Sequence, residues 1–347
     1  MTALAAILKG MIAEDGPMPL DRYMALCLGH PVHGYYMTRD PFGAQGDFTT
    51  APEISQVFGE LLGVWVAQAW AGLGSPSHFA LVELGPGRGT LMADMLRVLT
   101  KAPNCRKAAQ VHFVETSPVL RDVQREKVPD ATWHASIASL PALPTIMIAN
   151  EFFDALPIRQ FERRNGHVFE RCVGLRGDEL AVVLVPSVQR IAREGVFEDA
   201  AIRNTIATHL GDHLRTCGGF ALMIDYGHVV SAPGDTLQAM KAHAYCAITD
   251  HPGEADVTSH VDFEALAKGF ASAGAHVLGL MPQGDFLEAM GLSARTETLA
   301  RTISGDARQN LVTATERLAH RDQMGQLFKV MAVAGTAATP IYPFGAA

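Results

Sequence analysis

The fold is decided by residues 79–90, FALVELGPGRGT. The first six residues form an apolar run that predicts a short buried strand, and Leu91, Met95 and Leu96 then recur at helical spacing. Glycines between a strand and a helix let the backbone approach a ligand closely, and they direct free N–H groups of the helix N-terminus toward it. The stretch therefore predicts a βα unit that binds an anionic or polar ligand.

The glycine spacing indicates which ligand is bound. A dinucleotide fingerprint, GxGxxG, starting at Gly85 would need its third glycine at position 90, which is Thr90; the third glycine, Gly89, comes one place early. This spacing favours the form found in methyltransferases, in which Glu83 would meet a cation such as the α-ammonium of a methionine moiety. We therefore predict that S-adenosyl-L-methionine binds at Glu83, Gly85, Gly87 and Gly89. The alternatives are a nicotinamide cofactor and a purely structural turn.

A second candidate cofactor ligand is Glu115, at the end of the next predicted strand, residues 111–115. A carboxylate in this position can accept hydrogen bonds from both ribose hydroxyls. Glu115 follows the glycines by more than the usual spacing of about 20 residues, because the linker before the strand is long. The alternative is that Glu115 is only a charge near the N-terminus of a helix that Ser117 caps and Pro118 begins.

The pattern along the chain predicts an α/β fold. Apolar strands alternate with helices, which favours a parallel sheet with helices on both faces; further strands are expected at 145–149, 220–225, 275–280 and 328–333. Residues 1–75 predict an N-terminal helical cap and lid segment, and residues 76–347 the core. Between about 159 and 200 the apolar period changes to two around an Asn165-Gly166 turn signal, which predicts an inserted antiparallel β element.

The composition narrows the class of protein. The chain has 347 residues, 48% of them hydrophobic, and a formal net charge of −8, so it predicts a globular enzyme rather than a nucleic-acid-binding protein. Five scattered cysteines without a CxxC pair favour a reducing cytoplasm, and the histidines lack metal-site spacing. The apolar residues near the N-terminus are too few and too interrupted by charge for a signal peptide or a membrane span.

Candidate acceptor residues follow the strand predicted at 145–149. In an open α/β sheet the carboxyl end of such a strand lies beside the cofactor. We expect Glu151 and Asp154 to bind the methyl acceptor, Asn150 to orient it, and Phe152 or Phe153 to form a wall. The alternative is that Asp154 caps a following helix and the phenylalanines belong to the core.

Two further segments carry polar residues of interest. Asp47, Thr50 and Glu53 could fold over the cofactor as a lid that excludes water. Thr50 and Glu53 also have the spacing of a helix capping box. His260 and the pair Asp225-Tyr226 are alternative general bases.

Three segments together resemble a known family: 46–60, GDFTTAPEISQVFGE; 82–90, VELGPGRGT; and 150–157, NEFFDALP. They closely resemble the MidA-like family of class I methyltransferases, which includes the mitochondrial complex I assembly protein arginine methyltransferase. The likeness continues through 252–263, PGEADVTSHVDF. It implies a Rossmann-like class I methyltransferase sheet with an N-terminal helical cap and an inserted antiparallel β element.

The resemblance also implies an activity. Eukaryotic members are expected to methylate an arginine in a respiratory complex I subunit, so we expect this chain to be a protein arginine methyltransferase with a protein partner. Three alternatives stay open: an assembly chaperone that binds S-adenosyl-L-methionine without catalysis, an NAD(P)-dependent oxidoreductase, and a methyltransferase that acts on a small molecule.

Overall fold

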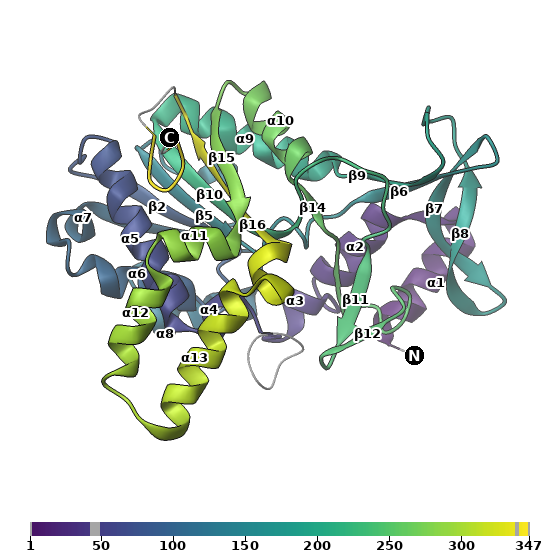
Figure 1. The fold of residues 1–347 in the computed structure, drawn as a ribbon. Helices are drawn as coiled ribbons and strands as arrows, with labels where there is room; N and C mark the ends of the chain where they lie inside the picture. The colour runs from purple at the N-terminus through teal and green to yellow at the C-terminus, as the bar shows by residue number, and fades with distance from the viewer. Residues whose placement is uncertain (1, 42–48, 337–339, 346–347) are drawn as a thin grey trace.

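A computed structural model describes residues 2–41, 49–336 and 340–345. Its centre is a large mixed sheet in the order β15-β16-β10-β5-β2-β3-β4, with β14 paired to β10 (Figure 1). Strands β10, β5, β2, β3 and β4 are parallel neighbours, whereas β16 runs antiparallel to both β10 and β15. The strands are β2 (Phe79–Leu84), β3 (Ala109–Val114), β4 (Thr132–His134), β5 (Thr145–Asn150), β10 (Gly219–His228), β14 (Val261–Asp262), β15 (His276–Pro282) and β16 (Phe328–Ala334).

Helices cover both faces of this sheet, which is why its central strands are nearly continuous apolar runs. On one face, α5 and α6 pack against side chains such as Leu81 and Ile148. On the other face, α9 and α10 pack against the alternate positions, such as Val82 and Met147. The predicted α/β sheet is therefore confirmed. The helices of this region are α5 (Gln56–Gly72), α6 (Thr90–Leu99), α7 (Pro103–Ala108), α8 (Pro118–Lys127), α9 (Ala201–Cys217) and α10 (Phe263–Ser272), with a short 3-10 helix η1 (Ile137–Ser139).

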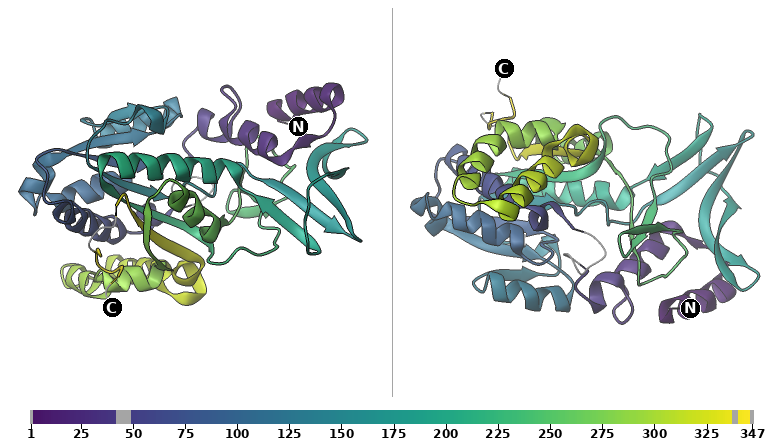
Figure 2. Two further views of the ribbon diagram at one scale, coloured as in Figure 1. Left: turned by 90° about the horizontal axis from the view of Figure 1, so that it is seen from above. Right: turned by 60° about the horizontal axis from the view of Figure 1, so that its bottom comes forward.

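A second region combines N-terminal helices with antiparallel strands, and both views in Figure 2 place it at the end of the molecule away from the C-terminal helices. Its core joins Leu8 and Tyr23 of the helices to Val173 of the inserted sheet. The predicted hairpin turn is present: Asn165 and Gly166 both have positive φ, 52° and 80°. The elements are α1 (Ala3–Asp15), β1 (Met18–Pro19), α2 (Leu20–Gly29), α3 (Tyr35–Thr38), β6 (Arg159–Arg164), β7 (His167–Arg176), β8 (Glu179–Pro186) and β9 (Gly195–Asp199).

A third, three-stranded sheet was not expected from the sequence. It consists of β11 (Gln238–Lys241), β12 (Ala244–Cys246) and β13 (Asp256–Thr258), in a stretch to which the sequence pattern assigned no strand. Strands of three or four residues are too short to show a clear period of two. Within residues 1–75, α5 packs on the large sheet, while α1 and α2 pack on the inserted one. The division of the chain at residue 75 stays a prediction.

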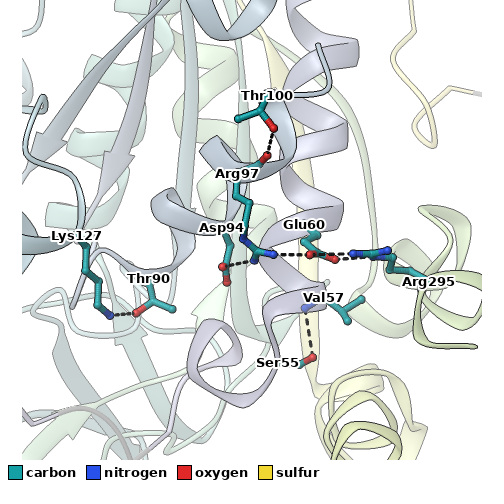
Figure 3. A network of polar contacts seen from close by, with 9 residues as sticks. All are labelled: Ser55, Val57, Glu60, Thr90, Asp94, Arg97, Thr100, Lys127 and Arg295. Carbon is teal, nitrogen blue, oxygen red and sulfur yellow. Dashed lines mark hydrogen bonds and ion pairs between the residues drawn. The ribbon is translucent and has the colours of Figure 1, made fainter. Parts of the chain in front are cut away.

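The C-terminal helices are fastened to the core by an ionic network (Figure 3). Glu60 of α5 has only 3% of its surface exposed, and it accepts hydrogen bonds from Arg97 of α6 at 2.8 Å and from Arg295 of α12 at 2.7 Å. Burial raises the pKa of Glu60, but the two guanidinium groups outweigh this effect and hold the pKa below its usual value. The segment contains α11 (Gln283–Ala289), α12 (Leu292–Ala300), α13 (Gly305–Ala319) and a π-helical turn, η2 (Arg321–Gly325).

We predict that Glu60→Ala lowers the free energy of unfolding by about 2 kcal/mol at pH 7, as expected for lost hydrogen bonds between charged groups. The loss stays below that of a fully buried pair because Arg97 and Arg295 are partly exposed and keep water contact. Since the folded-state pKa of Glu60 is depressed, its contribution is present above the unfolded value near 4.3 and fades as the pH falls through the folded value. Urea unfolding of the wild-type and variant proteins measures the effect at pH 7 and again at an acidic pH below the folded-state pKa of Glu60, where the difference should disappear.

The matched control is Glu297→Ala, which removes the exposed pair of Glu297 in α12 with Arg301, the C-cap residue of that helix. Such a pair contributes about 0.5 kcal/mol or less. Equal losses in the two variants would contradict an anchoring role for Glu60.

Candidate functional site

A cavity of about 540 Å³ opens at the carboxyl ends of the parallel strands, where an open α/β sheet binds its ligands. Residues from all three regions line it. The main contributors are the glycine turn after β2, the segment after β3, the loop after β5, the three-stranded sheet and the segment from α13 to the start of β16. Among the described residues, no group of three or more His, Cys, Asp or Glu side chains is arranged to hold a metal ion.

The glycine turn has the backbone that its sequence predicts. Gly85, Gly87 and Gly89 have φ values of 60°, 51° and 75°, a left-handed region that disfavours other residues. A Cβ atom on Gly85 would also lie 3.0 Å from the ring of Phe152. Gly85 and Gly87 line the cavity, while Gly89 is the N-cap residue of α6.

Glu83 lies at the bottom of the turn with 3% of its surface exposed. Its Oε2 atom is buried and has no hydrogen-bond partner among the described residues. Burial raises the pKa of Glu83 well above its usual value, and the backbone N–H of Met92 opposes this only in part. A cationic donor from a ligand would therefore satisfy Glu83.

Glu115 follows β3 and lines the same cavity. Its Oε1 accepts the backbone N–H groups of Thr116 and Ser117, both at 2.7 Å, and burial raises its pKa despite these bonds. Gln124 of α8 donates both to Glu115 Oε2 at 3.2 Å and to the carbonyl of Gly87 at 2.7 Å. Gln124 thus connects the two predicted cofactor-binding segments. Sequence reasoning missed it, and its only signal was a polar residue on the buried side of an amphipathic helix.

The end of β5 and the loop after it bring together the predicted acceptor residues Asn150, Glu151 and Asp154, and all three line the cavity. Glu151 Oε1 accepts the side-chain amide of Asn150 and the backbone N–H of Ala51, each at 3.0 Å. Asp154 Oδ2 accepts the hydroxyl of Tyr226 at 2.8 Å. Asp154 Oδ1 and Asn150 Oδ1 are buried without a partner among the residues described. No helix begins within this loop, so Asp154 is not a helix cap.

Burial and like charge act together on the acceptor residues. Burial, with a further contribution from the Asp154 charge, raises the pKa of Glu151 to about 7, and the N–H of Ala51 and the amide of Asn150 oppose this increase. Burial also raises the pKa of Asp154, against the Tyr226 hydroxyl and the charge of Arg203. A carboxyl group with a pKa near 7 can exchange a proton at neutral pH.

Two buried charged residues, Asp225 and Arg203, bind the backbone of this loop, and neither of them lines the cavity. Asp225 accepts the backbone N–H groups of Phe153 and Asp154 at 3.0 and 3.2 Å. Arg203, 2% exposed, donates to the carbonyls of Asp154, Leu156 and His260. Asp225 does not line the cavity, whereas its partner in the general-base hypothesis, Tyr226, does. That hypothesis stays a prediction. Arg203 carried no local sequence signal.

The remaining alternative base, His260, lines the cavity and stacks edge-on against Tyr226. Burial lowers its pKa, with neighbouring cations adding to the effect, so the imidazole is neutral at pH 7. Its role as a base stays untested.

The segment over the cavity contains α4 (Ala51–Ile54). Thr50 lines the cavity but its side chain makes no capping bond, and Glu53 instead accepts the hydroxyl of Thr90 at 2.5 Å and pairs with Arg88 at 3.5 Å. The capping box predicted for these two residues is therefore not formed. Asp47 lies outside the described residues.

Fold and site together define a class I methyltransferase that uses S-adenosyl-L-methionine. The arrangement closely matches the crystal structure of a COG1565 superfamily member from Burkholderia thailandensis bound to S-adenosyl-homocysteine, with a TM-score of 0.83 and 27% identity over 98% of this chain and 92% of that chain. The family model described as "Putative S-adenosyl-L-methionine-dependent methyltransferase" matches residues 61–281.

Curated relatives are similar over nearly the full length. The Xenopus tropicalis "Protein arginine methyltransferase NDUFAF7, mitochondrial" is 35% identical, over 93% of this chain and 83% of that protein. The human protein of the same name is 33% identical, over 96% of this chain and 83% of that protein. The chain belongs to the MidA-like family of S-adenosyl-L-methionine-dependent methyltransferases, and the predicted cofactor is confirmed.

We predict that Gly87→Val abolishes binding of S-adenosyl-homocysteine, measured by calorimetry, because a branched side chain would enter the space where the turn approaches its ligand. The matched control is Gly177→Val in the turn between β7 and β8. Gly177 also has a positive φ, 63°, but a Cβ there would contact nothing within 4 Å. Binding that survives in both variants, or is lost in both, would argue against a specific role for Gly87.

Proposed function

We propose that this methyltransferase transfers the methyl group of S-adenosyl-L-methionine to a guanidinium nitrogen of an arginine in a protein. The observation that supports this most directly is the unpaired acceptor atoms Asp154 Oδ1 and Asn150 Oδ1, which belong to residues that line the cavity beside Glu151. Guanidinium presents N–H donors only, in a planar arrangement. It therefore matches a wall that presents mainly acceptors.

The cofactor would be held by the residues around the glycine turn. The orphaned carboxylate of Glu83 would bind the α-ammonium of the methionine moiety, and Glu115 the ribose hydroxyls. Gly85 and Gly87 would allow close backbone approach, Gly89 would fix the start of α6, and Thr50 would form part of the covering wall. Asp47 is proposed for this group on sequence grounds alone.

The acceptor residues would act by orientation and proton removal. When bound, the cofactor supplies a sulfonium methyl group that is open to in-line attack. Guanidinium is always protonated in water, so a proton must leave as the new N–C bond forms and the C–S bond breaks. Glu151 would take that proton, since burial places its pKa near 7. Asp154, fixed by Tyr226 and by the backbone contacts of Asp225, would hold a second N–H of the acceptor.

The curated relatives support arginine as the acceptor, because their names describe protein arginine methyltransferases. The narrower proposal, that the acceptor protein is a subunit of respiratory complex I, rests on the family resemblance. Those relatives are named as mitochondrial, and for this chain a cytoplasmic location stays a prediction. Within the described residues, no helix is both long enough and apolar enough to cross a membrane.

The test uses labelled cofactor and a pool of arginine-containing peptides, with an identical pool in which lysine replaces arginine. We predict methylarginine in the first pool only. Glu151→Gln and Asp154→Asn should each lower kcat by at least about 100-fold, the usual size of a general-base contribution, while S-adenosyl-homocysteine still binds. Glu179→Gln, which changes an exposed residue at the start of β8, is the control with unchanged activity.

If both acceptor variants keep full activity, the assigned roles are wrong. If the cofactor binds and no arginine peptide is methylated, the protein fits a non-catalytic assembly factor or a small-molecule enzyme instead.

The raised pKa of Glu151 predicts two pH dependences. Activity should increase with pH up to about 7 and then level off, because only the ionised carboxylate accepts a proton.

The second pH dependence concerns stability. The folded protein binds more protons than the unfolded chain between the unfolded pKa near 4.3 and about 7, so Glu151 makes the free energy of unfolding fall as the pH rises through this window. Glu151→Gln should remove that decline, as measured by urea unfolding across the pH range; an unchanged decline would show that another group causes it.

A further inference from the structure

The cavity extends beyond the cofactor turn to a rim of four apolar side chains from two separate parts of the chain. Met240 and Tyr245 come from strands β11 and β12, and Met324 and Leu327 come from η2 and the residues before β16. In Figure 1, the β11–β12 hairpin and α13 lie on either side of α3. We call these four residues the apolar rim.

The apolar rim is in contact with water. Tyr245 is 71% exposed and Leu327 is 45% exposed, and the two methionines are half-buried. Large apolar side chains gathered at the mouth of a functional cavity are typical of a surface that a partner covers. Methionine in particular adapts its shape to different apolar partners.

The charges near the rim limit what can bind there. The side chain of Arg317 on α13 is exposed and also lines the cavity. Asp256, the carboxylate on the β13 side, is 8% exposed and accepts the Tyr36 hydroxyl at 2.9 Å. The proposed acceptor carboxylates, Glu151 and Asp154, thus lie inside, while the exposed part of the lining presents apolar groups and Arg317. Two further charged residues of the lining, Glu53 and Arg88, pair with each other. One cationic group fits the interior, but further cations next to it would meet Arg317.

We propose that the apolar rim is a docking surface for the residues on either side of the acceptor arginine, and that these residues are apolar rather than basic. This inference rests on the proposed function and specifies its substrate class: an exposed protein segment with an arginine between apolar side chains. The guanidinium would reach Glu151 and Asp154 while its neighbours cover Tyr245 and Leu327. Free arginine would leave the rim uncovered, and its own carboxylate would lie close to an acidic cavity.

The experiment compares three peptide pools with a central arginine, using the full chain and labelled S-adenosyl-L-methionine. The flanking positions are apolar (Leu, Met and Val), neutral (Gly and Ser) or basic (Lys) in the three pools. We expect kcat/KM for the apolar pool to exceed that for the neutral pool by at least 10-fold, and the basic pool to be the poorest. Arg317→Ala should raise kcat/KM for the basic pool relative to kcat/KM for the neutral pool.

A double variant tests the rim directly. Tyr245→Ser with Leu327→Ser should raise KM for the apolar pool and reduce its advantage to less than twofold. Binding of S-adenosyl-homocysteine shows that this variant is folded. The matched control is Leu184→Ser with Val188→Ser, which changes apolar residues that are 38% and 100% exposed and do not line the cavity. The control should keep the full preference.

The outcomes separate this inference from the function on which it rests. Equal rates for the three pools, or a preference that survives the rim variant, would overturn the docking surface and leave arginine methylation intact. Failure to methylate any arginine pool while S-adenosyl-homocysteine binds would overturn both.

Discussion

Buried carboxylates without a cation limit what the central cavity can hold. A carboxylate removed from water must be paired, accept several hydrogen bonds or become protonated. Glu115 receives its donors from the protein, but Glu83 keeps one oxygen unpaired and Glu151 has its pKa raised to about 7. Bound ligands would supply the missing donors. A cofactor with an ammonium group and an acceptor with N–H groups would satisfy the two ends of the cavity separately.

The surrounding fold uses its own charges to keep these acceptor atoms available. Arg203 and Asp225 are buried directly behind the loop that follows β5, and both bind mainly backbone atoms there. Because the guanidinium of Arg203 is occupied by carbonyl oxygens, it stabilises the loop without neutralising Asp154 through a direct ion pair. Tyr226 orients one oxygen of Asp154, and the second oxygen stays unpaired within the described residues. Strand β10 thus supplies both Asp225, which binds the backbone of the loop, and Tyr226, which orients Asp154.

The parts of the structure that the sequence predicts are those encoded by local patterns. The glycine turn, the buried strands, the Asn165-Gly166 hairpin and the carboxylates at the carboxyl ends of β2, β3 and β5 each have a signal within a few residues. Gln124 and Arg203 act across 37 to 49 positions of the chain, through contacts that no local period reveals. Asp225, at the end of a predicted strand, was considered as half of a general-base pair, yet it accepts hydrogen bonds from backbone N–H groups. The apolar rim was missed because its halves lie about 80 positions apart and neither forms a long periodic element.

The hydrogen bond from Ala51 to Glu151 connects the covering segment to the proposed base. This N–H is one of the groups that hold the pKa of Glu151 down. A displacement of residues 49–54 that opened the cavity would remove this donor, but it would also hydrate the carboxyl group, and burial is the larger of the two effects on its pKa. In an open cavity Glu151 would therefore behave as an ordinary ionised carboxylate at neutral pH. The covering segment would thus determine when Glu151 has a pKa suited to exchanging a proton near pH 7.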